Sequence, residues 1–180
     1  APWTEAVIGY GEELSRLREH LIEQLDLQLA TIERSSTLRG IRLQFRRGWR
    51  EATLREALQQ SKGREAQAGR AVVGPQHDDW ILESDTRAVA GLSRGQAKLV
   101  SLILYRCRAA LMQAVARHPV LLMDDLVADL DPEALRAVLE LWRHAGLQIW
   151  LSVLEGDIGL DLPGKATRFH VKHGALQVVA

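Results

Sequence analysis

Two adjacent carboxylates, Asp124 and Asp125, directly follow a short apolar run at residues 120–123 (Val-Leu-Leu-Met). Such a run is typical of a strand that is buried on both faces of a parallel sheet. The carboxyl end of the strand lies at the sheet edge where open α/β folds bind ligands. One carboxylate can hold Mg²⁺ there, while its neighbour points the other way and can orient a hydrolytic water. A solvated acidic loop is the simpler alternative for the same residues.

A second candidate site lies where a helix begins. Residues 92–96 read Leu-Ser-Arg-Gly-Gln, directly before a long apolar helical pattern. Ser93 is a natural N-cap, and Gly95 allows the backbone to approach a ligand closely. The unpaired N–H groups and the dipole of the helix N-terminus attract anions, of which phosphate is the obvious one. Taken alone, the pentapeptide also fits an ordinary capped helix.

A strand–helix–strand unit positions both candidate sites. Residues 96–116 predict a helix that is apolar on most sides and therefore buried. After the strand at 120–123, Pro132 opens another helix, Gly146 closes it, and residues 147–153 form a second buried strand. This succession predicts a βαβ unit with a right-handed crossover.

The remaining elements follow from the same signals. Apolar residues recur every 3.6 residues between Leu14 and Ile32, which predicts an amphipathic helix over residues 10–33. Other patterns predict a strand at 41–47, a helix at 50–60, a polar linker at 61–69, two short strands at 71–73 and 80–82, and a terminal hairpin at 167–179 with His173 and Gly174 at its turn.

Composition excludes several classes of protein. The 180 residues carry 23 Lys and Arg against 23 Asp and Glu, and 47% of them are hydrophobic. This apolar content excludes intrinsic disorder, and the lack of an uninterrupted apolar run near 20 residues argues against a membrane span. The single cysteine, Cys107, cannot form an internal disulfide, so a cytoplasmic location is expected. The chain opens Ala-Pro-Trp without Met, which suggests a fragment.

Charge is unevenly distributed along the chain. Residues 39–70 hold nine Lys and Arg against three Glu, whereas residues 124–133 hold five acidic residues and no basic one. The basic segment could contact nucleic-acid phosphates, although such a run is often a solvated face. Trp49 and Trp80 are expected in the core, and the six histidines lack metal-ligand spacing. The candidate DNA contacts are Arg42, Arg46, Arg47, Arg50 and, in the following helix, Arg55.

Taken together, these motifs resemble those of a known ATPase family. Residues 92–96 resemble the signature motif of ABC-type ATPases, residues 120–125 their Walker B, and residues 128–131 their D-loop. Upstream, Phe-Arg-Arg-Gly-Trp at 45–49 and Gly-Pro-Gln-His-Asp-Asp at 74–79 narrow the resemblance to RecF. RecF is a bacterial recombinational-repair ATPase related to SMC and Rad50 proteins. The resemblance runs from about Trp3 to the end of the chain.

The resemblance implies an α/β fold with two parts. Residues 1–70 would form much of a helical arm domain, and residues 71–180 the C-terminal part of an ABC-type ATPase head, with a parallel sheet and flanking helices. Two subunits would face head to tail, so that the signature of one meets the ATP held by the other. The implied site residues are Ser93, Arg94, Gly95 and Gln96 for the nucleotide, Asp124 for Mg²⁺, Asp125 for the attacking water, and Asp129 and Asp131 of the D-loop for linking the two sites.

The implied function is an ATP-driven homodimeric clamp with slow hydrolysis. It would close on double-stranded or gapped DNA in replication and recombinational repair, with the RecR and RecO mediators as partners, in the cytoplasm at the nucleoid. Half of a transporter-type or other SMC-like ATPase remains an alternative, as does a non-catalytic module that binds DNA or protein. Residues 150–153 (Trp-Leu-Ser-Val) offer no switch histidine, which favours RecF over a transporter.

Two departures from the family pattern affect these expectations. Gln76 and His77 stand where RecF proteins typically read His-Arg, so the role of this pair is open. Residues 1–90 contain no P-loop, and the near match at residues 159–167 contains Pro163 and has Ala166 where Ser or Thr should hold Mg²⁺. We treat this segment as a loop, and therefore expect this chain alone to lack tight ATP binding and hydrolysis.

Overall fold

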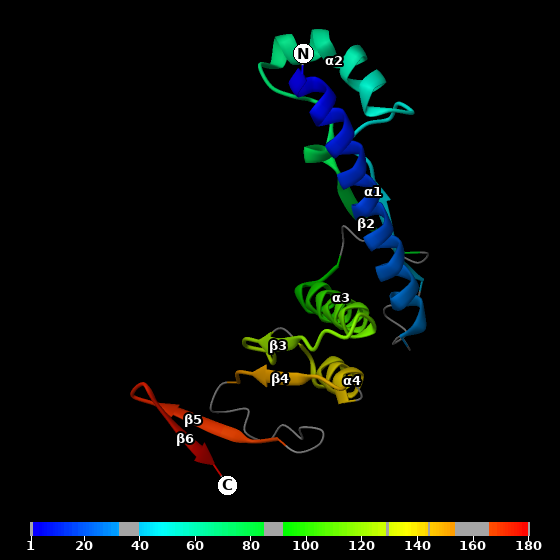
Figure 1. Cartoon of the computed structure of the whole chain (residues 1–180). Coiled ribbons are helices and arrows are strands. Elements are labelled where there is room, and N and C mark those ends of the chain that lie inside the picture. The colour runs from blue at the N-terminus through cyan, green and yellow to red at the C-terminus, as the bar shows by residue number, and fades with distance from the viewer. Residues whose placement is uncertain are drawn as a thin grey trace. The chain divides into compact units, whose positions relative to one another are not determined.

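The computed structural model describes residues 2–32, 40–84, 92–128, 130–143, 145–153 and 166–179. The chain divides into two compact units, residues 1–91 and residues 92–180 (Figure 1). Residues 79–84 belong to the first unit because they form a ribbon with residues 41–46. The division into an arm domain and an ATPase lobe, which the resemblance places after residue 70, stays a prediction.

The first unit is a long helix lying along a two-stranded antiparallel ribbon (Figure 1). The register of the ribbon places Ile41 opposite Ser84 and Arg46 opposite Asp79. Pro2 begins the helix because a first-turn residue needs no N–H donor, so the helix starts earlier than the apolar pattern predicts. The elements are α1 (Pro2–Thr31), β1 (Ile41–Arg46), α2 (Leu54–Ala68), a 3₁₀ turn η2 (Pro75–His77) and β2 (Asp79–Ser84).

Two sequence-based predictions for this unit were wrong. The segment expected as a linker continues α2 to Ala68, because its many Gln, Glu, Lys and Ala residues favour a helix and Ser61 is buried within it. Gly69 then ends the helix in the left-handed conformation, with its N–H donating to the Glu65 carbonyl. Residues 71–73 form no strand, since the partner of β2 is β1 and Val73 packs into the core instead.

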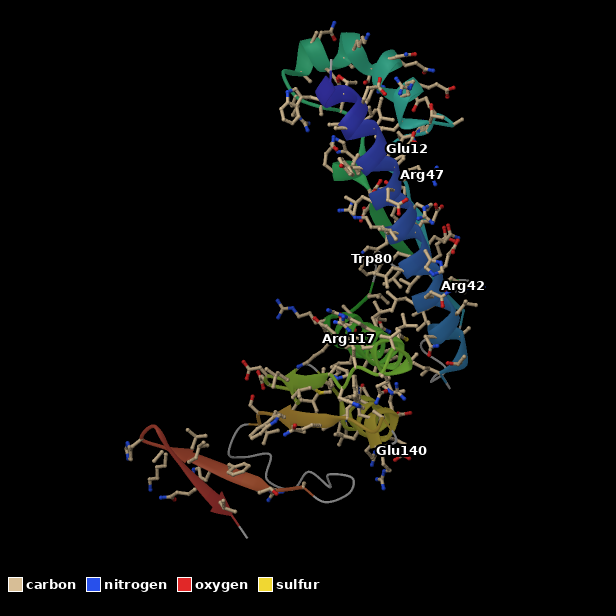
Figure 2. The ribbon with its side chains drawn as sticks, viewed as in Figure 1. Glu12, Arg42, Arg47, Trp80, Arg117 and Glu140 are labelled. Carbon is tan, nitrogen blue, oxygen red and sulfur yellow. The ribbon has the colours of Figure 1, made fainter. Side chains whose placement is uncertain are left out.

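The core of the first unit lies where α1, α2 and the segment after β1 meet. Its buried members are Ile8, Trp49, Leu54, Ala57 and Val73. Trp49 is buried as expected. Trp80 is 46% exposed, against expectation, because among the described residues its strand has β1 as its one neighbour (Figure 2).

The second unit contains the predicted βαβ arrangement. Two parallel strands of four residues each flank a helix, and a hairpin follows in which His173 and Gly174 both have positive φ angles of 49° and 76°. Rings of Trp150 and Phe169 stack at a centroid distance of 5.9 Å and join the hairpin to the parallel strands. The elements are α3 (Arg94–Ala114), β3 (Val120–Met123), α4 (Pro132–Arg143), β4 (Gln148–Leu151), β5 (Arg168–Lys172) and β6 (Ala175–Val179).

Burial of β3 differs from the prediction. Met123 is buried, but Val120 and Leu122 are 52% and 75% exposed. In the described ranges β3 has β4 as its one neighbour, and no second layer covers that face of the pair. A groove of about 530 Å³ lies between β3 and α3. Cys107 on α3 is buried as expected, and no helix in the described part of the chain is both long and apolar enough to cross a membrane.

Candidate functional site

Ser93 begins α3 with a reciprocal capping box. Its Oγ accepts the Gln96 N–H at 3.2 Å, and the Gln96 side-chain oxygen accepts the Ser93 N–H at 3.0 Å. The predicted N-cap is therefore confirmed. Gln96, expected among the nucleotide contacts, has its side-chain oxygen turned back toward its own helix. Ser93 and Arg94 are exposed, and Gly95 is half-buried beside them.

Asp124 and Asp125 lie directly after β3, and Ser152 after β4 contacts both of them. The Ser152 hydroxyl donates to Asp124 Oδ1 at 2.5 Å and accepts the Asp125 N–H at 2.9 Å. The parallel pairing explains this contact, because Met123 and Leu151 are opposite each other and the next residues leave the two strands side by side. The Ser152 N–H also donates to the Met123 carbonyl at 2.9 Å.

The backbone turns sharply at the second carboxylate. Asp125 has a φ of 49°, in the left-handed region that Asp and Asn tolerate better than most residues. Asp124 and Asp125 are both exposed, so their side chains are accessible from solvent. A left-handed residue directly after a strand is an observed outlier of the kind that clusters at functional sites.

Lys98, in the second turn of α3, ties the capped helix to the acidic segment. Its ammonium group donates to the carbonyl oxygens of Asp125 and Ala128, both at 2.6 Å. A cation that joins two backbone carbonyls three residues apart fixes the course of the loop between them. The start of α3 and the segment after β3 are thus held together within the second unit.

Asp131 serves as the cap of α4. Its Oδ1 accepts the N–H groups of Glu133 at 3.0 Å and Ala134 at 2.8 Å, which satisfies two first-turn donors of that helix. Asp129, the other residue expected to link the sites, lies outside the described residues, as does most of the segment 159–167. In the described ranges, no three His, Cys, Asp or Glu side chains gather closely enough to hold a metal ion. Mg²⁺ in nucleotide sites typically takes one or two carboxylates together with phosphates and waters, and the exposed Asp124 fits that limited role.

Most of the arginines expected to contact DNA are paired with acidic side chains of their own unit. Arg42 contacts Asp26 at 2.6 Å, Arg46 contacts Asp79 at 3.0 Å, and Arg47 contacts Glu19 at 2.7 Å. Figure 2 shows Arg42 and Arg47 beside α1. The Arg47 guanidinium also lies 5.5 Å from the Trp49 ring centroid, and Arg55 pairs with Glu5. Arg50 forms no ion pair with any described side chain.

In the Gly-Pro-Gln-His-Asp segment, residues 74–78, the Gln76 and His77 side chains contact backbone carbonyls a few residues earlier in the chain. Gln76 Nε2 donates to the Val73 carbonyl at 2.8 Å, and His77 Nε2 lies 3.2 Å from the Ala71 carbonyl. These contacts hold the pair whose role the sequence left open against its own backbone. They favour a structural use of both side chains.

Asp78 connects this segment to α1 and to the turn after β1. Its carboxylate accepts from the Ser15 hydroxyl at 2.5 Å, the Arg18 guanidinium at 3.1 Å and the Gly48 N–H at 2.9 Å. Ser15 is buried, and the Asp78 side chain is only 2% exposed. A Cβ at Gly48 would lie 2.1 Å from the Gly74 carbonyl oxygen, so the two backbones can approach only because residue 48 is glycine. The two upstream motifs, residues 45–49 and 74–79, thus pack closely together around Asp78. We call this pair of segments the bracket around Asp78.

Comparison with known proteins identifies the family. The chain is 36% identical over 143 residues to the DNA replication and repair protein RecF of Thioalkalivibrio sulfidiphilus, which covers 77% of this chain and 40% of that protein. It is 34% identical to the RecF of Stenotrophomonas maltophilia, over 99% of this chain and 50% of the relative. The chain belongs to the RecF family and corresponds to the C-terminal half of RecF proteins. No family model matches it.

Solved structures agree on the fold. A RecF–ATP structure, described as a recombination mediator protein in the RecFOR pathway, superposes with a TM-score of 0.68 at 21% identity and covers 98% of this chain and 49% of its own. A second RecF structure, with ATPrS, gives a TM-score of 0.65 at 17% identity. The predicted α/β fold is confirmed, because it matches the fold of the corresponding half of these RecF structures. The chain spans about half the length of the curated RecF relatives that it matches.

Sequence reasoning missed two residues of the candidate site. Ser152 was noted only because it is not a histidine, although its place directly after the second parallel strand put it next to the acidic pair. Lys98 gave no sequence signal beyond lying one and a half turns into the capped helix. Both act through contacts with segments that are distant along the chain, 27 or more residues away.

Proposed function

We propose that this chain is the C-terminal part of a RecF-type, ATP-dependent DNA-binding protein that acts in DNA replication and recombinational repair. It would supply the Walker B carboxylates for one nucleotide and the signature turn for another, held by a facing subunit. The proposal assigns residues 1–70 to the arm domain and residues 71–180 to the ATPase lobe.

The arrangement of Ser152, Asp124 and Asp125 supports this proposal most strongly. One hydroxyl donates to the first carboxylate and accepts from the backbone of the second, which fixes the two acids in different settings. Asp124, next to the strand, would hold Mg²⁺ against the phosphates, and the metal would supply positive charge that offsets charge developing on the γ-phosphate. Asp125, beyond a left-handed turn, would orient the attacking water.

The capped start of α3 suits the proposed role of the signature. Ser93 Oγ is an acceptor in the capping box, so its own hydroxyl proton is available to a phosphate oxygen. The helix N-terminus adds the N–H groups of the first turn and a favourable dipole. Ser93 and Arg94 are exposed, as a contact with a facing subunit requires.

Lys98 gives each subunit a physical link between its two roles. The helix that would read the partner's nucleotide is hydrogen-bonded through this lysine to the loop that follows the subunit's own Walker B. The D-loop residues Asp129 and Asp131 would continue this link toward the facing subunit. For Asp131, the capping of α4 fixes its position at the start of that helix.

DNA would be bound by the whole protein, with RecR and RecO as partners, in the cytoplasm at the nucleoid. Among the arginines first considered, Arg50 is the best placed for a phosphate because it forms no ion pair with a described side chain. Arg42, Arg46 and Arg47 would have to release acidic partners, at a cost, before contacting DNA.

A fusion protein tests the proposal. The N-terminal half of the Stenotrophomonas maltophilia RecF is joined to residues 1–180, and ATP binding is measured by calorimetry for the fusion and for the chain alone. The proposal predicts tight, Mg²⁺-dependent binding by the fusion and none by the chain alone. Micromolar binding by the chain alone would contradict it and would restore the segment 159–167 as a phosphate cradle. A fusion that folds but binds no ATP would also contradict it.

A further inference from the structure

α1 exposes a continuous row of large apolar side chains. Between 41% and 82% of each side chain's surface is accessible to solvent in the first unit. Scattered exposed apolar residues are normal, but six on one helix within 19 residues are not. We call this row the α1 seam, and its members are Trp3, Val7, Tyr10, Leu14, Leu17 and Leu21.

The spacing of the seam is that of a coiled coil. Successive members are separated by four, three, four, three and four residues, the alternation that places every member on one stripe of a helix. At 1.5 Å per residue the stripe is about 27 Å long. The spacing matches another helix better than a strand or an irregular loop, because knobs at these steps fit the holes of a facing helix.

The seam is distinct from the face by which α1 packs on its own unit. That face carries the buried residues Ile8, Gly11, Ser15, Asp26 and Leu29. At 100° per residue the two faces are centred roughly 120° apart around the helix. The 3.6-residue pattern in the sequence merged them, since it began on the seam residues Leu14, Leu17 and Leu21 and then included Leu29 of the buried face. α1 thus has a buried face of mixed polarity, which described residues cover, and a separate apolar stripe, which they leave exposed.

Charges beside the seam are already matched within the chain. Glu13 pairs with Arg16 at 2.7 Å, and Arg18 donates to the Pro75 carbonyl and to Asp78. A nucleic acid or an anionic membrane would need unpaired Lys or Arg along this stripe. The recognition surface is therefore apolar and electrically balanced.

We propose that the α1 seam packs against an amphipathic helix of about 19 residues that carries its own apolar residues at steps of three and four. That helix would come from the part of a RecF-type protein that this chain does not match. The RecF relatives are about twice as long as the matched region, so they contain a second half of similar size. The choice of a RecF-type partner helix rests on the proposed function, whereas the exposure and spacing of the seam do not depend on it.

Hydroxyl-radical footprinting tests the proposal on the chain alone and on the fusion with the N-terminal half of the Stenotrophomonas maltophilia RecF. We expect labelling of Trp3, Tyr10 and Leu17 to fall at least about fivefold in the fusion, because packing removes these side chains from water. Leu27 is the matched control, since it is 59% exposed on the same helix and lies roughly 120° around the helix from the centre of the seam. Its labelling should be equal in the two proteins.

Each outcome separates this inference from the proposed function. Seam residues that are protected in a fusion unable to bind ATP would support the seam and contradict the function. A fusion that binds ATP while its seam is labelled as fast as in the chain alone would overturn the inference. Seam protection in the chain alone that increases with protein concentration would also overturn the inference, because it would indicate packing against a second copy. Protection that requires added anionic vesicles would overturn it as well, because it would indicate a membrane surface. In the fusion, Leu14→Glu with Leu17→Glu should restore labelling of Tyr10, whereas Leu27→Glu should not.

Discussion

The Ser152 hydroxyl lies 2.5 Å from Asp124 Oδ1 and accepts the N–H of Asp125 at 2.9 Å. One side chain at the end of β4 therefore sets the positions of both carboxylates at the end of β3. Transporter-type ATPases place a histidine after the corresponding strand. In this chain the Ser152 hydroxyl, which is smaller than an imidazole and uncharged, contacts both residues of the acidic pair directly.

Ser152→Ala removes this contact. We expect a loss of about 1 kcal/mol in the free energy of unfolding, the usual net value of such hydrogen bonds. In the fusion protein, ATP turnover should fall as well, since Asp124 and Asp125 lose a shared constraint. Ser101→Ala is the control, because the Ser101 hydroxyl donates to the Ala97 carbonyl of its own helix. Urea denaturation and a phosphate-release assay measure both effects, and equal behaviour of the two variants would contradict the role of Ser152.

Asp124→Asn and Asp125→Asn should differ in their effects on the fusion protein. Loss of the metal-binding charge at Asp124 should weaken Mg²⁺-dependent ATP binding itself. Asp125→Asn should leave binding intact and slow turnover by about a hundredfold or more, because the group that orients water is lost. Asn also tolerates the left-handed backbone at this position. Nucleotide titration and turnover rates measure the two effects, and equal loss of binding in both variants would refute the assignment.

Gly48→Ala and Gly63→Ala should shift stability in opposite directions. A Cβ at position 48 would lie 2.1 Å from the Gly74 carbonyl oxygen, so the bracket around Asp78 must open, at a cost of about 3 kcal/mol. Position 63 is within α2 and open to solvent, so Ala should stabilise the helix by about 0.5–1 kcal/mol. Urea denaturation of the chain measures both changes. A harmless Gly48→Ala would show that the bracket is not closely packed.

The ion pair between Glu5 and Arg55 should be visible as a pH dependence. The hydrogen bond from Arg55 lowers the pKa of Glu5 below its usual value of 4.5. Because the folded-state pKa is the lower one, the stabilisation is present above the unfolded-state pKa and is lost as pH falls through the folded-state value. In a carboxyl NMR titration, Arg55→Met should raise the pKa of Glu5. Arg16→Met should instead raise that of Glu13, which Arg16 hydrogen-bonds, and leave Glu5 unchanged.

Local signals in the sequence predicted much of the second unit. The N-cap at Ser93, the parallel pairing of β3 and β4 and the His173-Gly174 turn each depend on residues close together in sequence or on a strong apolar run. The positions of the candidate site residues were predicted for the same reason, since the acidic pair follows a strand and Ser93 precedes a helix. The roles assigned to these residues stay predictions. Its internal contacts were not predicted, because Lys98 and Ser152 reach across 27 or more residues.

Predictions for the first unit failed where a pattern was read without its neighbours. The polar segment after residue 60 looked like a linker, yet Ser61 is buried and the helix continues to Ala68. The arginines looked like one basic surface, but acidic residues of α1 and β2 pair with Arg42, Arg46 and Arg47. Pairing partners that are distant along the chain cannot be read from local charge or apolar spacing.

The central claim is that the signature turn acts across a subunit interface, and Ser93→Arg in the fusion protein tests it most directly. If Ser93 only caps α3, its loss costs about 1 kcal/mol of stability and has no further effect. If it meets a phosphate held by the facing subunit, the bulky variant should bind ATP as tightly as the unchanged fusion yet fail to dimerise. Sedimentation with and without ATP measures this: we expect ATP-dependent dimers for the unchanged fusion and monomers for Ser93→Arg, and normal ATP-dependent dimers of a correctly folded Ser93→Arg would contradict the account.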